Sequence, residues 1–298
     1  MVDLMDMFPT EDACLEYLAL IRWRDGYKCP RCGCCESWKM GSGLYRCKEC
    51  RHNCSVISGT IFQDTRKPLR LWMQAIWYVV NQKNGVSALG LQKALGLGSY
   101  HTAWEWLHKL RRAMVRPNRD RLSGVVEVDE TLVGGERSGK RGRGADGKTL
   151  VFIAVEVAQK GIGRIRLTTL KNASSESLLQ ATQSTIKQGS TVCSDGWDGY
   201  NIITKNGYIH QPTTHANSQS GDATTLAHRV AALLKRWWLG THQGAISPEH
   251  LEYYLDEFTF RFNRRTSKSR GKLFYRLIEQ GLQIEPKPAK LLYTTSSG

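Results

Sequence analysis

The sequence has no apolar run approaching the roughly 20 residues that a membrane-spanning helix needs, so we expect no membrane partner. Its first six residues, MVDLMD, lack the basic start of a secretory signal, and we therefore expect a cytoplasmic protein. Acidic residues are too few to balance the basic ones: 27 Asp and Glu stand against 42 Lys and Arg, a net charge of +15. Because this excess is spread along the chain, it indicates a polyanionic partner, and nucleic acid fits best.

An even set of cysteines suited to a disulfide framework is also missing, since the nine cysteines are odd in number and gather early in the chain. Two Cys-x-x-Cys pairs lie fourteen residues apart, a spacing typical of a tetrahedral four-thiolate zinc site. Such a site contributes folding energy rather than chemistry. Cys35 or Cys54 could replace one ligand. The predicted zinc ligands are Cys29, Cys32, Cys47 and Cys50.

Three helical segments follow, at residues 68–80, 87–95 and 99–114. A short turn containing two glycines joins the second to the third, as in a helix-turn-helix. The alternative is a three-helix packing that binds no nucleic acid. If the third helix lies in a DNA groove, its basic side chains contact phosphate. They are Lys109, Arg111 and Arg112.

Composition divides the chain into four segments, with a polar linker before residue 124 and a Pro- and Ser-bearing tail. The tail is expected to be loose. The expected domains are an N-terminal helix with a zinc ribbon (1–60), a helix-turn-helix domain (61–115), a catalytic domain (124–285) and the tail (286–298).

Residues 124–133 are Val-rich and contain three acids, and the two glycines that follow predict the end of a strand. Side chains alternate across a strand, so Glu127 and Asp129 share one face and Glu130 takes the other. An acid in an apolar strand needs a charged or hydrogen-bonded neighbour, and a metal ion would serve. The alternative is that Asp129 simply lies at an exposed strand end.

Further strands are predicted at residues 149–157, 163–170, 190–197 and 208–211, with helices at 174–187 and 224–238. This order predicts an α/β fold: a ribonuclease-H-like mixed sheet of five strands. In that arrangement the first and fourth strands are neighbours, which would bring Asp129 and Asp195 together. Two close carboxylates repel unless a cation lies between them, and Mg²⁺ prefers such oxygen ligands.

Two further basic stretches suit a phosphate backbone. One is a Gly-rich loop after residue 134, for which a disordered hairpin tip is the alternative. The other follows an apolar helical stripe at residues 251–262. Their candidate DNA-binding residues are Arg137, Lys140, Arg141, Arg143, Arg264 and Arg265.

Four stretches of the chain form a recognisable set of motifs. They are Cys29-Pro-Arg-Cys32 with Cys47-Lys-Glu-Cys50, Val128-Asp129-Glu130-Thr-Leu-Val-Gly-Gly135, Ser194-Asp195-Gly-Trp-Asp-Gly-Tyr200 and His228-Arg-Val-Ala-Ala-Leu-Leu-Lys235. Together they resemble the bacterial insertion-sequence transposases of the DDE superfamily that begin with a zinc ribbon, the insertion-sequence 1595 group. The resemblance covers nearly the whole chain in order.

The resemblance implies that Asp129 and Asp195 are the first two metal-binding acids. The third family position, often Glu, falls on His228, seven residues before Lys235, which would contact DNA phosphate. A neutral His suits Mn²⁺ better than Mg²⁺. His228 could instead position water or phosphate, or be an ordinary helix residue. An oxygen ligand could then come from Asp222, Glu249 or Glu252.

The function implied is a DNA transposase with structural Zn²⁺ and catalytic Mg²⁺ or Mn²⁺. Its DNA partners would be the terminal inverted repeats and the target, and pairing two ends implies a homodimer or larger assembly. The alternatives are a ribonuclease-H-like nuclease without strand transfer, or a catalytically inactive DNA-binding regulator. The His at the third position keeps the last alternative open.

Overall fold

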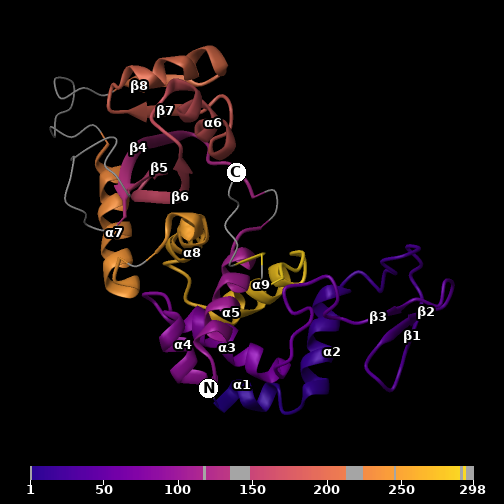
Figure 1. Cartoon of the computed structure of the whole chain (residues 1–298). Coiled ribbons are helices and arrows are strands. Elements are labelled where there is room, and N and C mark those ends of the chain that lie inside the picture. Colours follow the sequence, from indigo (N-terminus) through magenta and orange to yellow (C-terminus); the bar gives the residue numbers. More distant parts are fainter. Residues whose placement is uncertain are drawn as a thin grey trace. The chain divides into compact units, whose positions relative to one another are not determined.

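The computed structural model describes residues 2–116, 119–134, 148–212, 224–244, 246–288 and 291–292 (Figure 1). The chain divides into two compact units. The first unit is Met1–Arg116 with Ser267–Gly298, and the second is Pro117–Thr266.

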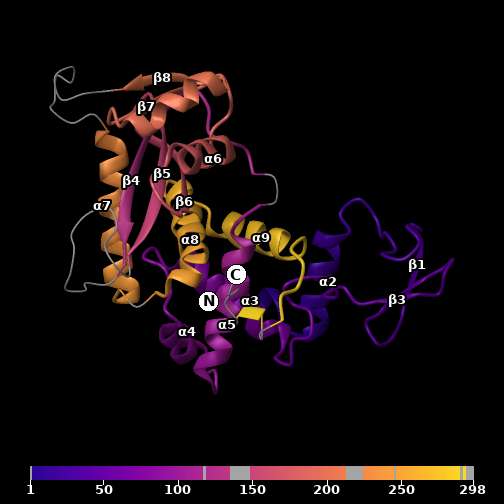
Figure 2. The same cartoon turned by 45° about the horizontal axis from the view of Figure 1, so that its top comes forward.

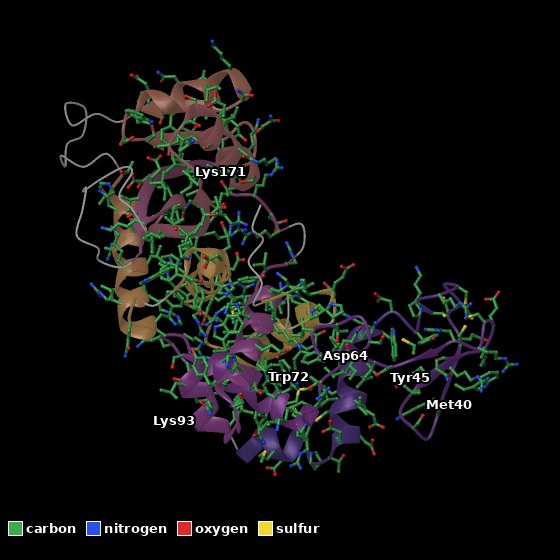
Figure 3. All side chains as sticks on the ribbon, viewed as in Figure 1. Met40, Tyr45, Asp64, Trp72, Lys93 and Lys171 are labelled. Atoms are coloured by element: carbon green, nitrogen blue, oxygen red, sulfur yellow. The ribbon has the colours of Figure 1, made fainter. Side chains whose placement is uncertain are left out.

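The first unit contains a small antiparallel sheet in the order β1-β2-β3, formed by β1 (Ser37–Lys39), β2 (Tyr45–Cys47) and β3 (Asn53–Cys54). Strands this short bury little apolar surface by themselves. An aromatic cluster supports the sheet, because the ring of Tyr45 lies 4.5 Å from that of Trp23 and 6.2 Å from that of Tyr27. Figure 3 labels Tyr45 and Met40 on this part of the chain.

Helices make up the rest of the first unit: α1 (Val2–Met7), α2 (Glu11–Arg22), α3 (Leu69–Asn81), α4 (Ala88–Leu95), α5 (Tyr100–Ala113) and α9 (Arg270–Gly281). Their core contains Trp72, labelled in Figure 3, whose ring stacks on Trp106 with centroids 3.9 Å apart. Helix α4 ends at Gly96, whose φ of 62° is the left-handed conformation that glycine adopts at helix ends. The helices predicted at residues 87–95 and 99–114 are therefore present as α4 and α5.

Helix α9 corrects one boundary drawn from composition, which placed residues up to 285 in the catalytic segment. In the structure α9 packs against α2, α3 and α5 of the first unit. Its buried stripe includes Phe274, whose ring lies 6.0 Å from Phe8 and 5.8 Å from Trp77. An amphipathic pattern shows which face of a helix is buried, but it does not show which core receives that face.

The second unit is built on a five-stranded sheet in the order β6-β5-β4-β7-β8. The strands are β4 (Val125–Val133), β5 (Thr149–Ala158), β6 (Gly161–Leu170), β7 (Thr191–Ser194) and β8 (Ile209–Pro212). The pairs β4–β5 and β5–β6 are antiparallel, whereas β4–β7 and β7–β8 are parallel. This order and these directions are the ribonuclease-H-like topology that the sequence predicted.

Helices cover both faces of this sheet: α6 (Ser175–Thr185), the 3-10 helix η1 (Asp198–Asn206), α7 (Thr225–His242), the 3-10 helix η2 (Pro248–His250) and α8 (Leu251–Asn263). Helices α6 and η1 share one apolar layer with Val126, Val128 and Phe152 of the sheet. Helices α7 and α8 share the apolar layer on the opposite face with Val133 and Ile153 of the sheet. Figure 2 shows α7 lying along the sheet. The two layers fix which face each β4 side chain occupies.

Candidate active site and zinc centre

Strand β4 presents its acids to two different helices. Glu127 and Asp129 lie on the α7 face, where Glu127 accepts hydrogen bonds from backbone amides of α7 and Asp129 contacts His228. Glu130 lies on the opposite face and accepts a hydrogen bond from the Tyr200 hydroxyl of η1. The alternation predicted from sequence is therefore realised, with apolar residues of the same strand filling both layers.

The parallel pairing of β4 with β7 sets Glu127 opposite Cys193. Asp129 follows Glu127 by two residues on β4, and Asp195 follows Cys193 by two residues, directly after the end of β7. Burial, together with nearby carboxylates that include Asp129 and Asp195, raises the pKa of Tyr200 well above its ordinary value. Asp129 on β4 and Asp195 just after β7 therefore both act electrostatically on one buried phenol.

The two aspartates differ in their surroundings. Asp129 is largely enclosed, with a side chain 12% exposed, whereas Asp195 is exposed just beyond the end of β7. Asp195 Oδ1 accepts a hydrogen bond from the backbone amide of Trp197, 3.2 Å away. This Asx turn orients the carboxylate at the point where the strand stops.

His228 lies in the first turns of α7, directly over Asp129. Its Nε2 is 3.0 Å from Asp129 Oδ2 and 3.4 Å from Thr224 Oγ1. The imidazole is 53% exposed, so one side of this pair is open to solvent. An imidazole nitrogen and carboxylate oxygens are a donor set that accepts divalent transition metals. Asp129 and His228 thus supply two such donors side by side, whereas among the described residues Asp129, Asp195 and His228 do not form a group close enough to share one ion.

Lys235 is exposed seven residues after His228, which is two helical turns. The acids considered as substitutes for a third carboxylate lie elsewhere or outside the described residues. Glu252 accepts hydrogen bonds from Thr169 on the edge strand β6, and Glu249 lies in η2, beyond the far end of α7. Asp222 is outside the described residues.

Several basic residues considered for DNA contact are held by the protein itself. The Arg265 guanidinium donates to the backbone carbonyl oxygens of Ile162 and Gly163 and lies 4.2 Å from the centre of the Phe262 ring. Arg264 lies 4.1 Å from the centre of the Phe260 ring. Both side chains thus have contacts within the protein.

The basic residues of α5 are also partly enclosed. Lys109 Nζ lies 2.8 Å from Glu105 Oε1, one helical turn away. Arg111 is buried and Arg112 is half-buried. The residues Arg137, Lys140, Arg141 and Arg143 lie outside the described residues.

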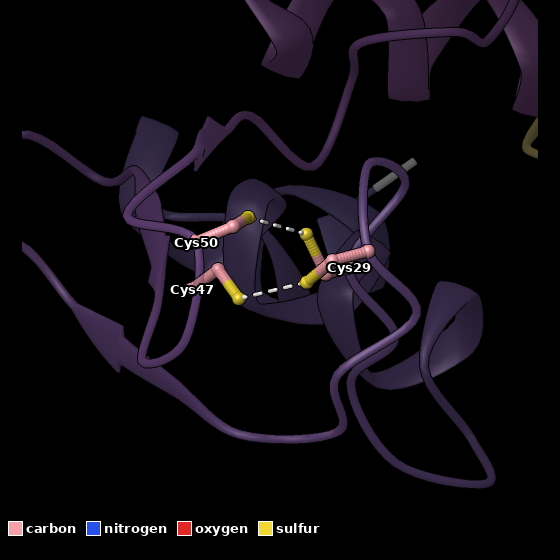
Figure 4. Close-up of side chains that lie close together, drawn as sticks. Cys29, Cys47 and Cys50 are labelled. Atoms are coloured by element: carbon pink, nitrogen blue, oxygen red, sulfur yellow. Dashed lines mark hydrogen bonds between the residues drawn. The ribbon is translucent and has the colours of Figure 1, made fainter.

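Four cysteines of the first unit converge on one point (Figure 4). The Sγ atoms of Cys29 and Cys50 are 3.6 Å apart, and those of Cys32 and Cys47 are 3.5 Å apart. All four lie within 4.8 Å of one another. Zinc–sulfur bonds of about 2.3 Å in a tetrahedron require sulfur atoms about 3.8 Å apart, so these residues fit Zn²⁺.

The surroundings of the cluster lower the pKa of Cys29 and Cys47, whereas hydrogen bonds with the other cysteines help to raise the pKa of Cys32. Burial works against ionisation of Cys29, but backbone amides of Cys32 and Arg31 outweigh it and lower the pKa of Cys29 to about 6. Cys54 is buried outside the cluster with its Sγ near the Ser55 carbonyl oxygen, and Cys35 is exposed. The predicted ligand set therefore needs neither alternative.

Two residues of the site gave no functional signal in the sequence. Glu127 reaches α7 across 99 residues of sequence, and Tyr200 reaches Glu130 across 70. Alternation predicted the faces of Glu127 and Glu130 but predicted no partner for either.

Among the described residues no helix is long and apolar enough to cross a membrane.

Taken together, the fold and the site define a protein with a zinc ribbon and a ribonuclease-H-like domain that carries an acidic site. A family model for the ISXO2-like transposase domain matches residues 121–263, and one for the transposase zinc-ribbon domain matches residues 9–53. The chain belongs to this family of insertion-sequence transposases.

A relative in Halobacterium salinarum, described as an uncharacterized protein in transposable element ISH50, is 27% identical over 287 residues. The match covers 89% of this chain and 94% of the relative. Two solved structures are also similar in part, a Mos1 transposase paired-end complex with left transposon end and a pre-cleavage Mos1 transpososome. Their identities are 12% and 11% and their TM-scores 0.32 and 0.29, over 74% of this chain and 79% of theirs.

Proposed function

We propose that this transposase cleaves DNA at the ends of its element and joins the freed ends to target DNA, using divalent ions held by Asp129, Asp195 and His228. The observation that supports the proposal is that Asp129 lies on β4 and Asp195 directly follows the adjacent parallel strand β7, with His228 Nε2 3.0 Å from Asp129. When bound there, Mg²⁺ or Mn²⁺ would activate an attacking oxygen and stabilise a leaving one.

The reaction has two displacements at phosphorus. In the first, water attacks the phosphodiester at the element's end, a new P–O bond forms, and the P–O3′ bond breaks to leave a 3′-hydroxyl. In the second, that hydroxyl attacks a target phosphodiester and displaces another 3′-oxygen. No outside energy source is needed, because the joining step exchanges one phosphodiester for another.

The residues of this chain have separate roles in the proposal. Asp129 and Asp195 hold the ions, and the enclosure of Asp129 reduces competition from water. His228 completes the donor set, and its nitrogen favours Mn²⁺ over Mg²⁺. Lys235, exposed two turns further along α7, would bind DNA phosphate as a point charge.

DNA as the partner is supported by the net charge of +15, which attracts a phosphate backbone. The zinc ribbon and the α4–α5 pair would bind the terminal inverted repeats, and the acidic site would act on the scissile phosphates. The joining of two ends in one event requires at least two copies of the chain in the DNA complex.

The test uses the full-length protein, Mn²⁺ and two DNA substrates: an intact element end and a pre-cleaved end with a supercoiled plasmid. The expected result is a nick at the intact end and joined plasmid products from the cleaved one. Asp129→Asn and Asp195→Asn should abolish both while end binding persists. Nicks without joined products would indicate a nuclease, and variants that mobilise the element as well as wild type would indicate a DNA-binding regulator.

A further inference from the structure

Helix α7 lacks a side-chain cap of its own. Its N-cap residue is Thr224, whose side chain makes no capping hydrogen bond. Instead, Glu127 of β4 supplies the acceptor: its Oε2 lies 2.8 Å from the Leu226 amide nitrogen and 3.2 Å from that of Ala227. Helix starts leave such amides without partners and carry positive partial charge, so a carboxylate is well suited to this position.

We call these two hydrogen bonds from the Leu226 and Ala227 amides to Glu127 the clamp. The clamp lies next to the Asp129–His228 pair both along β4 and along α7. Glu127 is two residues before Asp129 on the same face of β4, so their Cα atoms are about 7 Å apart. The clamped amides immediately precede His228 on α7. One strand therefore holds both the acid and the start of the helix that carries its imidazole partner.

We propose that Glu127 is a positioning residue that fixes the first turn of α7 against β4 and so sets the His228–Asp129 distance. Its effect on catalysis rests on the function proposed above, but the clamp itself does not. The carboxylate acts through backbone amides and through His228. Residues that orient a metal ligand in this way commonly affect metal affinity by about 10- to 100-fold.

The chain contains a matched control in its other unit. Glu11 accepts hydrogen bonds from the backbone amides of Leu69, at 2.5 Å, and Arg70, at 3.4 Å, at the start of α3. It is the same device: a distant glutamate that holds the first turn of a helix. Glu11→Ala removes a comparable clamp without touching the second unit's helix α7.

The experiment compares full-length wild type, Glu127→Ala, Glu127→Gln and Glu11→Ala by three measurements. Amide hydrogen exchange reports on the first turn of α7, and the ¹⁵N chemical shifts of the His228 ring report on its contact with Asp129. A Mn²⁺ titration of end cleavage gives the concentration for half-maximal rate. The first two measurements need neither DNA nor activity.

Glu127→Ala should speed exchange at Leu226 and Ala227 roughly 5-fold, as expected for loss of a cap, and shift the His228 resonances. It should raise the half-maximal Mn²⁺ concentration at least roughly 10-fold. Glu127→Gln keeps an acceptor oxygen and should retain the exchange protection and most of the Mn²⁺ response. Glu11→Ala should speed exchange in α3 alone.

Two results would overturn the proposal. One is a Glu127→Ala protein whose α7 exchange and His228 shifts match wild type. The other is a Glu127→Gln protein that keeps α7 protected yet loses Mn²⁺ response, which would make Glu127 a direct ligand. If wild type cleaves no DNA end with any divalent ion, the proposed function fails, and exchange and ring shifts still decide the positioning role.

Discussion

The Tyr200 hydroxyl donates a hydrogen bond to the Glu130 carboxylate, on the face of β4 opposite Asp129. Tyr200 is fully buried, and burial, followed by the charge of Glu130, raises the pKa of its hydroxyl. The phenol therefore remains a hydrogen-bond donor at neutral pH. This hydrogen bond connects η1, which follows Asp195, to β4, which carries Asp129. It therefore stabilises the site from the opposite face of the sheet.

Tyr200→Phe should lower the free energy of unfolding of the second unit by about 1.5 to 3 kcal/mol, the usual range for a hydrogen bond to a charged group. Tyr208→Phe is a matched control, since the Tyr208 hydroxyl donates to the neutral carbonyl of Ile186 at 3.1 Å. Its cost should be closer to about 1 kcal/mol. Urea unfolding followed by hydrogen exchange of β4 measures both, and equal costs would contradict a special role for Glu130.

The family resemblance implies a third metal-binding position at residue 228, where this chain has an imidazole. His228→Ala should slow end cleavage roughly 10- to 100-fold in Mn²⁺ through weaker ion binding. His228→Glu should shift the ratio of rates toward Mg²⁺, because an oxygen ligand suits the harder ion. Lys235→Ala is the control and should weaken DNA binding without changing the ratio. A His228→Ala protein with wild-type rates would reduce His228 to a surface residue of α7.

Local patterns in the sequence were enough to predict the strands of the second unit. They also predicted the sheet faces of Glu127, Asp129 and Glu130, because alternation is a property of a single strand. The third position was assigned to His228 through the family resemblance. The contacts of Glu127 and Tyr200 join segments 99 and 70 residues apart, and no local pattern encodes such pairs. The same limit explains α9, because no local pattern shows that its buried face packs against α2, α3 and α5 of the first unit.

The zinc centre allows a direct count of metal. Wild-type protein should contain one Zn²⁺ per chain by elemental mass spectrometry, and Cys32→Ser should lose it because a three-thiolate site binds far more weakly. Cys35→Ser is the matched control, since this exposed thiol lies outside the four-sulfur cluster. Removing zinc should melt the β1–β3 region, whose core is small, while β4–β6 stay protected from exchange. Retention of zinc by Cys32→Ser would mean that another cysteine completes the site.

Asp256 of α8 should make the second unit less stable as the pH rises. Burial, with a contribution from Glu252, raises the pKa of Asp256 from 3.8 to about 7, although Arg119 Nη1 lies 3.3 Å from its Oδ1. Between about pH 4 and pH 7 the folded state keeps a proton that the unfolded state has released, so stability falls through this window. Each pKa unit corresponds to about 1.4 kcal/mol, so between pH 4.5 and pH 7.5 wild type should lose about 3 kcal/mol relative to Asp256→Asn, which cannot titrate. Urea unfolding of the second unit at pH 4.5 and 7.5 measures this loss. The control is Asp198→Asn, at an exposed position, which should follow wild type. Parallel pH curves for wild type and Asp256→Asn would refute the prediction.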